Sequence, residues 1–234
     1  MAGSLFQQFE NIIVLDLETT GVDARGDEII ELAAVRLQDG PDGPVTAEQF
    51  DLFVQLSEGR VLPECIVELT GITQARLEAE GVPKQAAAER FVRLLDCERP
   101  LLAAYNAQFD LRFLFYFLNR FGMAQALRRA RLFDLLTVYR DRRPYPHRLE
   151  NAVAAYALQT QNTHRAIDDT LAAAELLQAM ERERDDLAQY INLFGYNPRY
   201  GVSGPRISSV RYVPQRYGGG RPLYELAEEV CAPV

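Results

Sequence analysis

The sequence has few of the side chains from which sulfur or imidazole metal sites are built. Its 234 residues include three cysteines, Cys65, Cys97 and Cys231, and two histidines, His147 and His164. An odd number of widely spaced thiols predicts no disulfide framework, and these residues provide no Cys/His spacing for zinc. We therefore expect the thiols to be free, reduced and structural.

Long apolar runs and a basic excess are also missing. No run approaches the roughly 18 apolar residues of a membrane span, and the opening MAGSLFQQFE has no Lys or Arg and leads into no apolar signal segment. We expect a soluble cytoplasmic protein without a membrane partner. The net charge of −8 argues against a protein that holds nucleic acid over a broad basic face.

Hydrophobic residues make up 48% of the chain, enough for a substantial core, and their period changes along it. Three extended segments come first, at residues 11–17, 27–38 and 48–55, and their short connections predict antiparallel pairing. Two short apolar strands follow at 101–105 and 131–133. Predicted helices cover residues 63–69, 73–79, 83–97, 109–121, 134–141, 148–157 and 166–188. This order predicts an α/β fold with a mixed five-stranded sheet flanked by helices.

The first predicted strand runs from four aliphatic residues into two carboxylates. Residues two apart in a strand share a face, so Asp16 and Glu18 project on the same side. A continuous aliphatic run is typical of a strand buried in a sheet, and the carboxyl end of such a strand is a usual place for chemistry. Alone, the pair is more typical of a solvated strand end.

Two further segments bring acids to strand or helix ends. Asp110 lies where the strand at 101–105 gives way to a helix, and Asp168 and Asp169 stand at the start of the helix at 166–188. Helix capping is the simplest interpretation of each, because acids in a first turn satisfy free amides and the helix dipole. His164, just before Asp168, would then be an exposed loop imidazole.

In combination and in order, the three segments resemble the three exonuclease motifs of the DEDDh, or DnaQ-like, 3′-to-5′ exonucleases. The matching positions are Asp16-x-Glu18 followed by Thr-Thr-Gly, Asn106-Ala-x-Phe-Asp110, and His164 with Asp169 after four intervening residues. The resemblance spans residues 10–186 and implies a ribonuclease H-like fold. Residues 68–73, ELTGIT, are similar to a segment of the subgroup related to bacterial polymerase proofreading exonucleases. Tyr105 departs from the pattern, since many members have His there.

The resemblance implies a pair of divalent cations, Mg²⁺ or Mn²⁺. Four acids without a neighbouring Lys or Arg would repel one another, and cations that prefer oxygen ligands remove this conflict. By the resemblance, Asp16, Glu18 and Asp169 would bind the first cation. Asp16, with water-mediated help from Asp110, would bind the second. The buried strand would then be a rigid mount for metal ligands.

The same resemblance assigns roles to residues that are not metal ligands. His164 would take the proton from the attacking water, a task that suits imidazole because its ordinary pKa is about 6.5. Backbone near Thr19, together with Asn106, would hold the 3′-terminal nucleotide. Phe109 would stack against a base or, equally, belong to the core. His147 lacks the acid spacing and is interpreted as structural or superficial.

Two regions outside the motifs have unusual composition. Residues 128–148 are basic by +5, which fits a solvated helix surface or contacts with phosphate. Residues 189–234 are rich in Gly, Pro, Tyr and Arg and are interpreted as a C-terminal extension to an exonuclease domain at 1–188. Residues 189–194, QYINLF, loosely resemble sliding-clamp-binding peptides, although Leu193 and Phe194 could instead fold back onto the domain.

Three functions follow from these patterns. The first is a DNA 3′-to-5′ exonuclease acting on single-stranded or frayed ends, with a DNA polymerase or sliding clamp as partner through the extension. The second is a 3′-to-5′ exoribonuclease that trims RNA. The third is an inert exonuclease fold whose extension binds a partner, against which the complete acid set argues.

Overall fold

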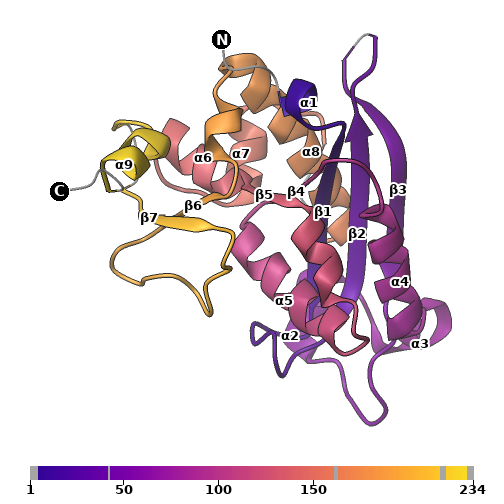
Figure 1. Ribbon diagram of the computed structural model, residues 1–234. Helices are drawn as coiled ribbons and strands as arrows, with labels where there is room; N and C mark the ends of the chain where they lie inside the picture. Colours follow the sequence, from indigo (N-terminus) through magenta and orange to yellow (C-terminus); the bar gives the residue numbers. More distant parts are fainter. Residues whose placement is uncertain (1–4, 42, 161–162, 217–219, 231–234) are drawn as a thin grey trace.

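A five-stranded mixed sheet forms the centre of the molecule (Figure 1). The computed structural model describes residues 5–41, 43–160, 163–216 and 220–230. The strands are β1 (Asn11–Thr19), β2 (Ile29–Gln38), β3 (Val45–Phe53), β4 (Pro100–Ala104) and β5 (Arg131–Asp134), in the order β3-β2-β1-β4-β5. β2 pairs antiparallel with β1 and β3, whereas β4 and β5 run parallel to β1. The predicted α/β fold is confirmed.

Helices cover both faces of this sheet. They are α1 (Leu5–Gln8), α2 (Glu64–Thr70), α3 (Gln74–Glu80), α4 (Lys84–Leu94), α5 (Ala107–Asn119), η1 (Ala124–Arg129), α6 (Leu135–Arg142), α7 (Leu149–Ala155), α8 (Ala166–Glu183) and η2 (Leu187–Tyr190). Figure 1 shows α4 and α5 on one side of the sheet and α8 on the other. The sheet is therefore the middle of three layers.

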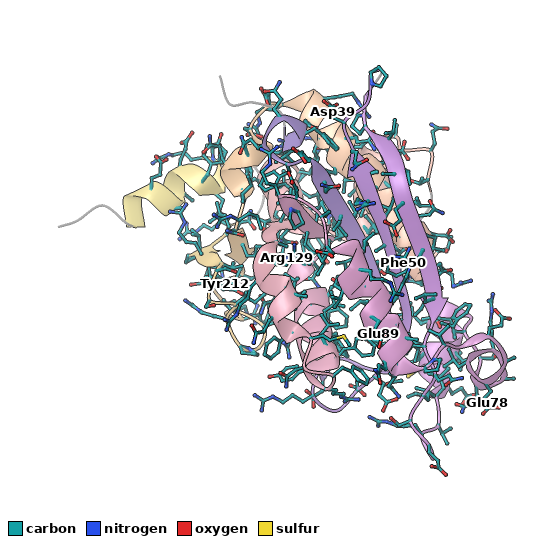
Figure 2. The ribbon with its side chains drawn as sticks, turned by 45° about the vertical axis from the view of Figure 1, so that its right-hand side comes forward. Asp39, Phe50, Glu78, Glu89, Arg129 and Tyr212 are labelled. Atoms are coloured by element: carbon teal, nitrogen blue, oxygen red, sulfur yellow. The ribbon has the colours of Figure 1, made fainter. Side chains whose placement is uncertain are left out.

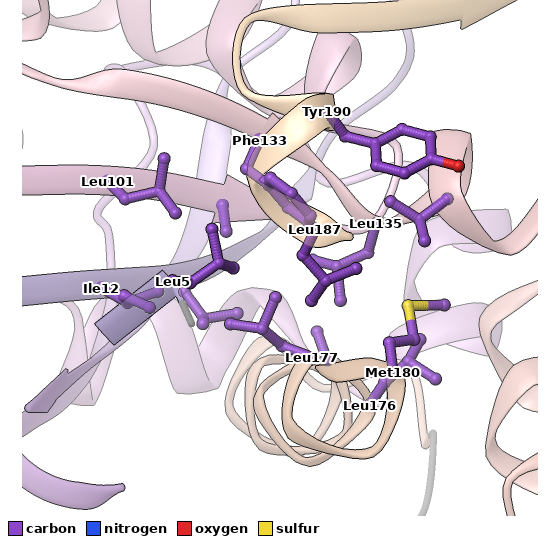
Figure 3. Close-up of a cluster of buried hydrophobic side chains, with 14 of the residues drawn as sticks. Leu5, Ile12, Leu101, Phe133, Leu135, Leu176, Leu177, Met180, Leu187 and Tyr190 are labelled. Atoms are coloured by element: carbon purple, nitrogen blue, oxygen red, sulfur yellow. The ribbon is translucent and has the colours of Figure 1, made fainter. Parts of the chain in front are cut away.

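β1 lies at the centre of the sheet and is packed on both faces. Its side chains alternate between two cores: Ile12 and Val14 belong to the cluster under α8, and Ile13 and Leu15 to the cluster under α4 and α5. Figure 3 shows the first cluster, with Ile12 opposite the α8 side chains. Burial on both faces explains why this strand reads as a continuous aliphatic run.

The segment ELTGIT contains the end of α2 and the tight turn that leads to α3. Gly71 ends α2 in the left-handed conformation, with φ of 69°, which a side chain rarely adopts. Ile72 then enters a third, smaller core cluster beside the ends of β2 and β3. The turn therefore anchors this helical pair to the sheet.

The C-terminal segment, residues 189–234, packs onto the sheet domain as far as it is described. It contains β6 (Leu193–Tyr196) and β7 (Arg211–Pro214), which pair in parallel, and α9 (Leu223–Val230). The backbone N–H of Asn192 donates to the carbonyl of Leu132, and the N–H of Leu132 donates to Asn192 Oδ1, both at 2.8 Å. The segment thus covers the open edge of β5.

Apolar residues of this segment enter the cores of the domain. Tyr190 and Leu193 join the cluster under α8, where Figure 3 shows Tyr190 near Leu135, and Phe194 joins the opposite cluster. The interpretation that Leu193 and Phe194 fold back onto the domain is confirmed. Clamp binding through residues 189–194 would require these side chains to leave the core.

Two predicted helices extend three or more residues beyond the observed ends. α4 ends at Leu94 instead of residue 97, and α8 ends at Glu183 instead of residue 188. After α8 the backbone is extended at Arg184, and the guanidinium of Arg142 donates to the Arg184 carbonyl at 3.3 Å and pairs with Asp186. Helical periodicity cannot reveal this stop, because Arg142 is distant in sequence.

Two further expectations concern thiols and membranes. Cys65 and Cys97 are free, as predicted, and Cys231 lies outside the described residues. None of the described helices is long and apolar enough to cross a membrane.

Candidate active site

The central strand β1 delivers two acids to one edge of the sheet. Asp16 and Glu18 follow its buried aliphatic part, and both are partly exposed, whereas the flanking Leu15 and Leu17 are buried. The ladder between β1 and β2 shifts register between Glu18 and Thr19. A rigid, fully packed strand therefore ends at the position where the two carboxylates emerge.

Helix starts supply two more acids. Asp169 lies in the first turn of α8, and one carboxylate oxygen from each of Asp16, Glu18 and Asp169 lies within 4.8 Å of the other two. Among the residues that the structure describes, no other group of three Asp, Glu, His or Cys side chains has ligand atoms within 4.8 Å of one another. Asp110, in the first turn of α5, is 2% exposed, and its charge acts on both Asp16 and Glu18. The structure thus brings together the four acids singled out from the sequence.

These acids oppose one another's ionisation. Burial raises the pKa of Asp16 well above its usual range, and the charges of Asp110, Asp169 and Glu18 add to the effect. Burial, followed by the charge of Asp169, raises the pKa of Glu18 to about 8. Burial also raises the pKa of Asp110, although a hydrogen bond from the backbone of Leu17 acts in the opposite direction. Divalent cations would relieve this repulsion, so the residues present fit an oxygen-ligated metal centre.

A buried ion pair beside the acids was not predicted from the sequence. Glu31 of β2 lies directly opposite Glu18 and is fully buried. Its Oε1 accepts from Nε and Nη2 of Arg165 at 2.9 and 2.6 Å, and its Oε2 accepts from the backbone N–H of Ala166 at 2.8 Å. Glu31 therefore fixes the start of α8, and with it Asp169. The sequence feature that could have indicated this ion pair is the single acid, Glu31, within the apolar strand sequence IIELAAV.

His164 lies on the short loop that precedes α8. Its side chain is exposed, and its backbone has a left-handed φ of 58°. The loop is held on both sides: the N–H of Thr163 donates to Asp169 Oδ1 at 3.1 Å, and Arg165 pairs with Glu31. The backbone on both sides of His164 is thus tied to residues at the acid cluster, and the role of His164 as a base remains a prediction.

Asp168 and His147 each have a hydrogen-bond partner within the fold. The hydroxyl of Thr163 donates to Asp168, which stands apart from the three clustered ligands. His147 Nε2 contacts the carbonyl of Arg143 at 2.9 Å, and its ring packs edge-on against Tyr139. The contacts of His147 agree with its sequence interpretation as structural.

Asn106 begins α5 in a left-handed conformation, with φ of 70°. Asp134, at the end of β5, accepts from the backbone N–H groups of Asn106 and Ala107 at 3.1 and 3.0 Å, and its other oxygen accepts from the Thr137 hydroxyl. Asp134 therefore fixes the backbone at the start of α5. The Asn106 side chain is exposed and makes no capping hydrogen bond. Both carboxylate oxygens of Asp134 thus accept structural hydrogen bonds.

The predicted nucleotide-contacting residues differ in environment. The hydroxyl of Thr19 donates to the carbonyl of Gly21 at 2.6 Å, which fixes the turn after β1. Phe109 is partly buried, and its ring centroid lies 4.9 Å from that of Phe113. Phe109 therefore contacts the core, as one of the two interpretations expects, and because it also lines a cavity, stacking against a base stays a prediction.

This cavity, of about 240 Å³, is completed by the C-terminal segment. Asn106, Gln108 and Phe109 line one side, and Tyr196, Tyr200 and Tyr212 belong to the other. Tyr200 is 74% exposed. Sequence reasoning missed this wall because no local pattern shows that residues 196–212 return to α5.

Searches among known proteins match the region that carries these acids. The model of the RNase_T exonuclease family matches residues 13–177. A DNA polymerase III PolC-type protein of Halalkalibacterium halodurans is 34% identical over 182 residues, which are 75% of this chain and 12% of that protein. A DNA polymerase III subunit epsilon of Aquifex aeolicus is 28% identical over 168 residues, 70% of this chain and 77% of that protein. The chain thus spans only about an eighth of its PolC-type relatives.

Solved structures share the fold. The zinc-bound Escherichia coli exonuclease I–ssDNA complex superposes with a TM-score of 0.68 and 23% identity, covering 78% of this chain and 43% of the other. Exonuclease I of Methylocaldum szegediense gives a TM-score of 0.64 with 24% identity, covering 76% and 41% of the two chains. At these identities the likeness establishes the fold alone.

Proposed function

Because this chain belongs to the exonuclease family, whose model spans its residues 13–177, we propose that it is a metal-dependent 3′-to-5′ exonuclease. It hydrolyses the phosphodiester bond at the 3′ end of single-stranded or frayed DNA. The observation that carries the proposal is the convergence of Asp16, Glu18 and Asp169 within 4.8 Å, from a strand end and a helix start, with Asp110 buried beside them.

Asp16, Glu18 and Asp169 would hold one divalent cation, and Asp16 with water-mediated help from Asp110 would hold a second. A bound cation pair supplies activation of a water molecule and stabilisation of the leaving oxygen of the phosphodiester. Mg²⁺ and Mn²⁺ suit an all-carboxylate set. The raised pKa values of Asp16 and Glu18 support this assignment, because cations would replace the protons that otherwise neutralise the cluster.

His164 accepts the proton of the attacking water at its ring nitrogen. The exposure of its side chain lets it release that proton to solvent. Asn106 and Phe109 hold the terminal nucleotide, and the cavity that they share with the tyrosines of the C-terminal segment offers aromatic surfaces for a base. Stacking is insensitive to base identity, which suits an enzyme that shortens any sequence.

A polymerase is the partner that the relatives suggest. The PolC-type and epsilon relatives are, by name, DNA polymerase III proteins. We propose that this chain likewise removes 3′ nucleotides in company with a DNA polymerase. Contact through residues 189–194 is disfavoured, because Tyr190 and Phe194 are 0% and 2% exposed.

Degradation of 5′-labelled single strands of DNA and RNA with Mg²⁺ tests the proposal. We expect stepwise shortening of DNA from the 3′ end, blocked by a 3′-terminal phosphorothioate and abolished by EDTA. Faster shortening of RNA would transfer the proposal to the exoribonuclease alternative.

Paired variants test the metal assignment in the same assay. Asp16→Asn removes one charge from the cluster and should abolish shortening. Asp168→Asn removes the same charge from an acid that is not one of the three clustered ligands and that accepts from the Thr163 hydroxyl, so it should retain most of the activity. Full activity in Asp16→Asn would refute the assignment, and equal loss in both variants would show that charge near α8, not ligation, matters.

A further inference from the structure

A second cavity, of about 780 Å³, lies away from the acid cluster and is lined by arginines. It is bounded by α5, η1, the start of β5 and residues 205–209 of the C-terminal segment. Its arginines are Arg112, Arg128, Arg129, Arg131 and Arg206, and no Asp or Glu is among its lining residues. The arginine cavity is therefore positively charged, although the net charge of the chain is −8.

The positive charge in the arginine cavity is mostly uncompensated. Arg129 pairs with Asp96 at 2.6 Å. Within the described part of the chain, Arg128, Arg131 and Arg206 have no carboxylate at ion-pair distance. In the view of Figure 2, Arg129 lies between α4, where Glu89 is labelled, and the C-terminal segment, where Tyr212 is labelled. Several like charges around one cavity repel one another, so an anionic ligand would stabilise the arrangement.

The wall of the cavity is built closely around Arg112. Its Nε is buried without a hydrogen bond, and its Nη1 reaches the hydroxyl of Ser203 only at 3.4 Å. Gly204 lies against the guanidinium: a Cβ there would sit 2.4 Å from Arg112 Cζ, and the φ of 74° also favours glycine. The C-terminal segment therefore holds a partly satisfied guanidinium at the cavity.

The basic stretch noted in the sequence divides into two groups. Arg142 and Arg143 form ion pairs with Glu183, and Arg148 lies 3.6 Å from Glu150. Arg128 and Arg131 instead line the cavity. The first group has carboxylate partners within the chain, and the second is available to a ligand.

The remaining lining favours nucleic acid over other anions. Phe115, 46% exposed, and Tyr116 place aromatic rings among the arginines, and Ser208 and Ser209 add hydroxyl donors. Arginine and hydroxyl groups bind phosphate oxygens, whereas rings stack on bases. An acidic peptide would use the arginines but would not need the exposed ring of Phe115.

α5 links this cavity to the proposed active site. Gln108 and Phe109 line the smaller cavity beside Asn106, and Arg112, Phe115 and Tyr116 line the arginine cavity one to two turns further along the helix. Residues 203–206 lie between them, because Gln108 Nε2 donates to the carbonyls of Ser203 and Pro205, each at 3.0 Å. A strand that ends at the acids would reach the arginine cavity with its upstream nucleotides.

We propose that the arginine cavity binds the backbone of single-stranded nucleic acid upstream of the 3′ terminus. The orientation of the strand rests on the proposed exonuclease function, whereas binding itself does not. The C-terminal segment would then act by completing a second nucleic-acid site on the chain.

Binding of a labelled oligothymidylate of about 16 nucleotides, measured by fluorescence anisotropy in EDTA at several salt concentrations, tests this proposal. The variant Arg128→Gln/Arg131→Gln replaces two exposed side chains, and thermal melting verifies its fold. Each lost phosphate contact on a single strand lowers the slope of log K against log salt by about 0.7, so we expect a decrease of about 1.4. Affinity at low salt should fall at least tenfold.

A matched control carries the same change of charge elsewhere. Arg93→Gln/Arg182→Gln alters two exposed arginines of α4 and α8 that do not line the cavity, and it should bind like the unaltered chain. Equal losses in both double variants would overturn the proposal, because they would reflect overall charge alone. An unchanged slope combined with lost binding of a labelled polyglutamate would overturn it in favour of an acidic peptide. Because EDTA prevents cleavage, salt-dependent binding by an inactive enzyme would refute the proposed function and leave this inference standing.

Discussion

The acid cluster and the arginine cavity are opposite in charge, and α5 contributes to both. Asp110 in its first turn belongs to the acids, and Arg112 belongs to the cavity. Each acid stands at the end of a strand or the start of a helix, inside a short motif. The arginines come from α5, η1, β5 and a returning C-terminal loop. Short sequence motifs indicate the acids of the first region. The arginines of the second region come from segments that are distant in sequence and meet only in the folded chain.

If the two regions act separately, a change at the proposed active site should alter turnover but not binding in EDTA. His164→Gln provides the largest such contrast. Loss of a general base lowers turnover roughly 10²–10⁴-fold. Single-turnover kinetics would measure this loss, Mn²⁺ calorimetry should show unchanged metal affinity, and anisotropy in EDTA should show unchanged oligonucleotide binding. Loss of Mn²⁺ binding would instead make the imidazole a ligand.

A smaller effect is expected from Glu31, which acts through its neighbours. Glu31→Gln weakens the hold on Arg165 and on the start of α8, so Asp169 should be less well placed. Partners that orient metal ligands typically contribute 10–100-fold to affinity. Calorimetry with Mn²⁺ should show a loss of this size. A loss of stability with unchanged Mn²⁺ affinity would reduce Glu31 to a purely structural role.

The smallest expected effect is a pH dependence of the stability of the metal-free protein. The pKa of Glu18 is raised to about 8 from an ordinary value of 4.5, so the folded state binds more protons than the unfolded state between these values. The free energy of unfolding should therefore fall as pH rises from about 4.5 to 8. Thermal melting in EDTA should give a midpoint lower by a few degrees at pH 8 than at pH 6.

Matched variants and added metal sharpen this pH prediction. Glu18→Gln should weaken the dependence, to which Asp16 and Asp110 also contribute because burial raises their pKa values. Glu64→Gln, which alters an exposed acid of α2, should leave it unchanged. Mn²⁺ should raise the midpoint more at pH 8 than at pH 6, because protons and cations compete for the same oxygens. A dependence that Glu18→Gln leaves undiminished would place its origin outside this carboxylate.

The sheet was predictable because each of its strands carries its own signal. The aliphatic run of β1 and the short apolar β4 and β5 indicate buried strands whatever surrounds them. The acids were predictable for the same reason, since Asp16 and Glu18 follow a strand and Asp110 and Asp169 open helices. Strand ends and helix starts at one sheet edge converge as soon as the sheet forms.

What could not be predicted depends on contacts between distant segments. Glu31 meets Arg165 only because α8 crosses β2, and Arg142 ends α8 from another helix. The C-terminal segment has a composition typical of an irregular tail, yet Tyr190 and Phe194 are core residues. Composition records the scarcity of regular structure there but not where the aromatic side chains pack.

Diffraction from crystals grown with Mn²⁺, collected at the manganese edge, tests the central claim most directly. The account predicts anomalous peaks within coordination distance of the carboxylates of Asp16, Glu18 and Asp169, and none in the arginine cavity. Peaks absent from the acid cluster at saturating Mn²⁺, or present there unchanged in Asp16→Asn crystals, would contradict it.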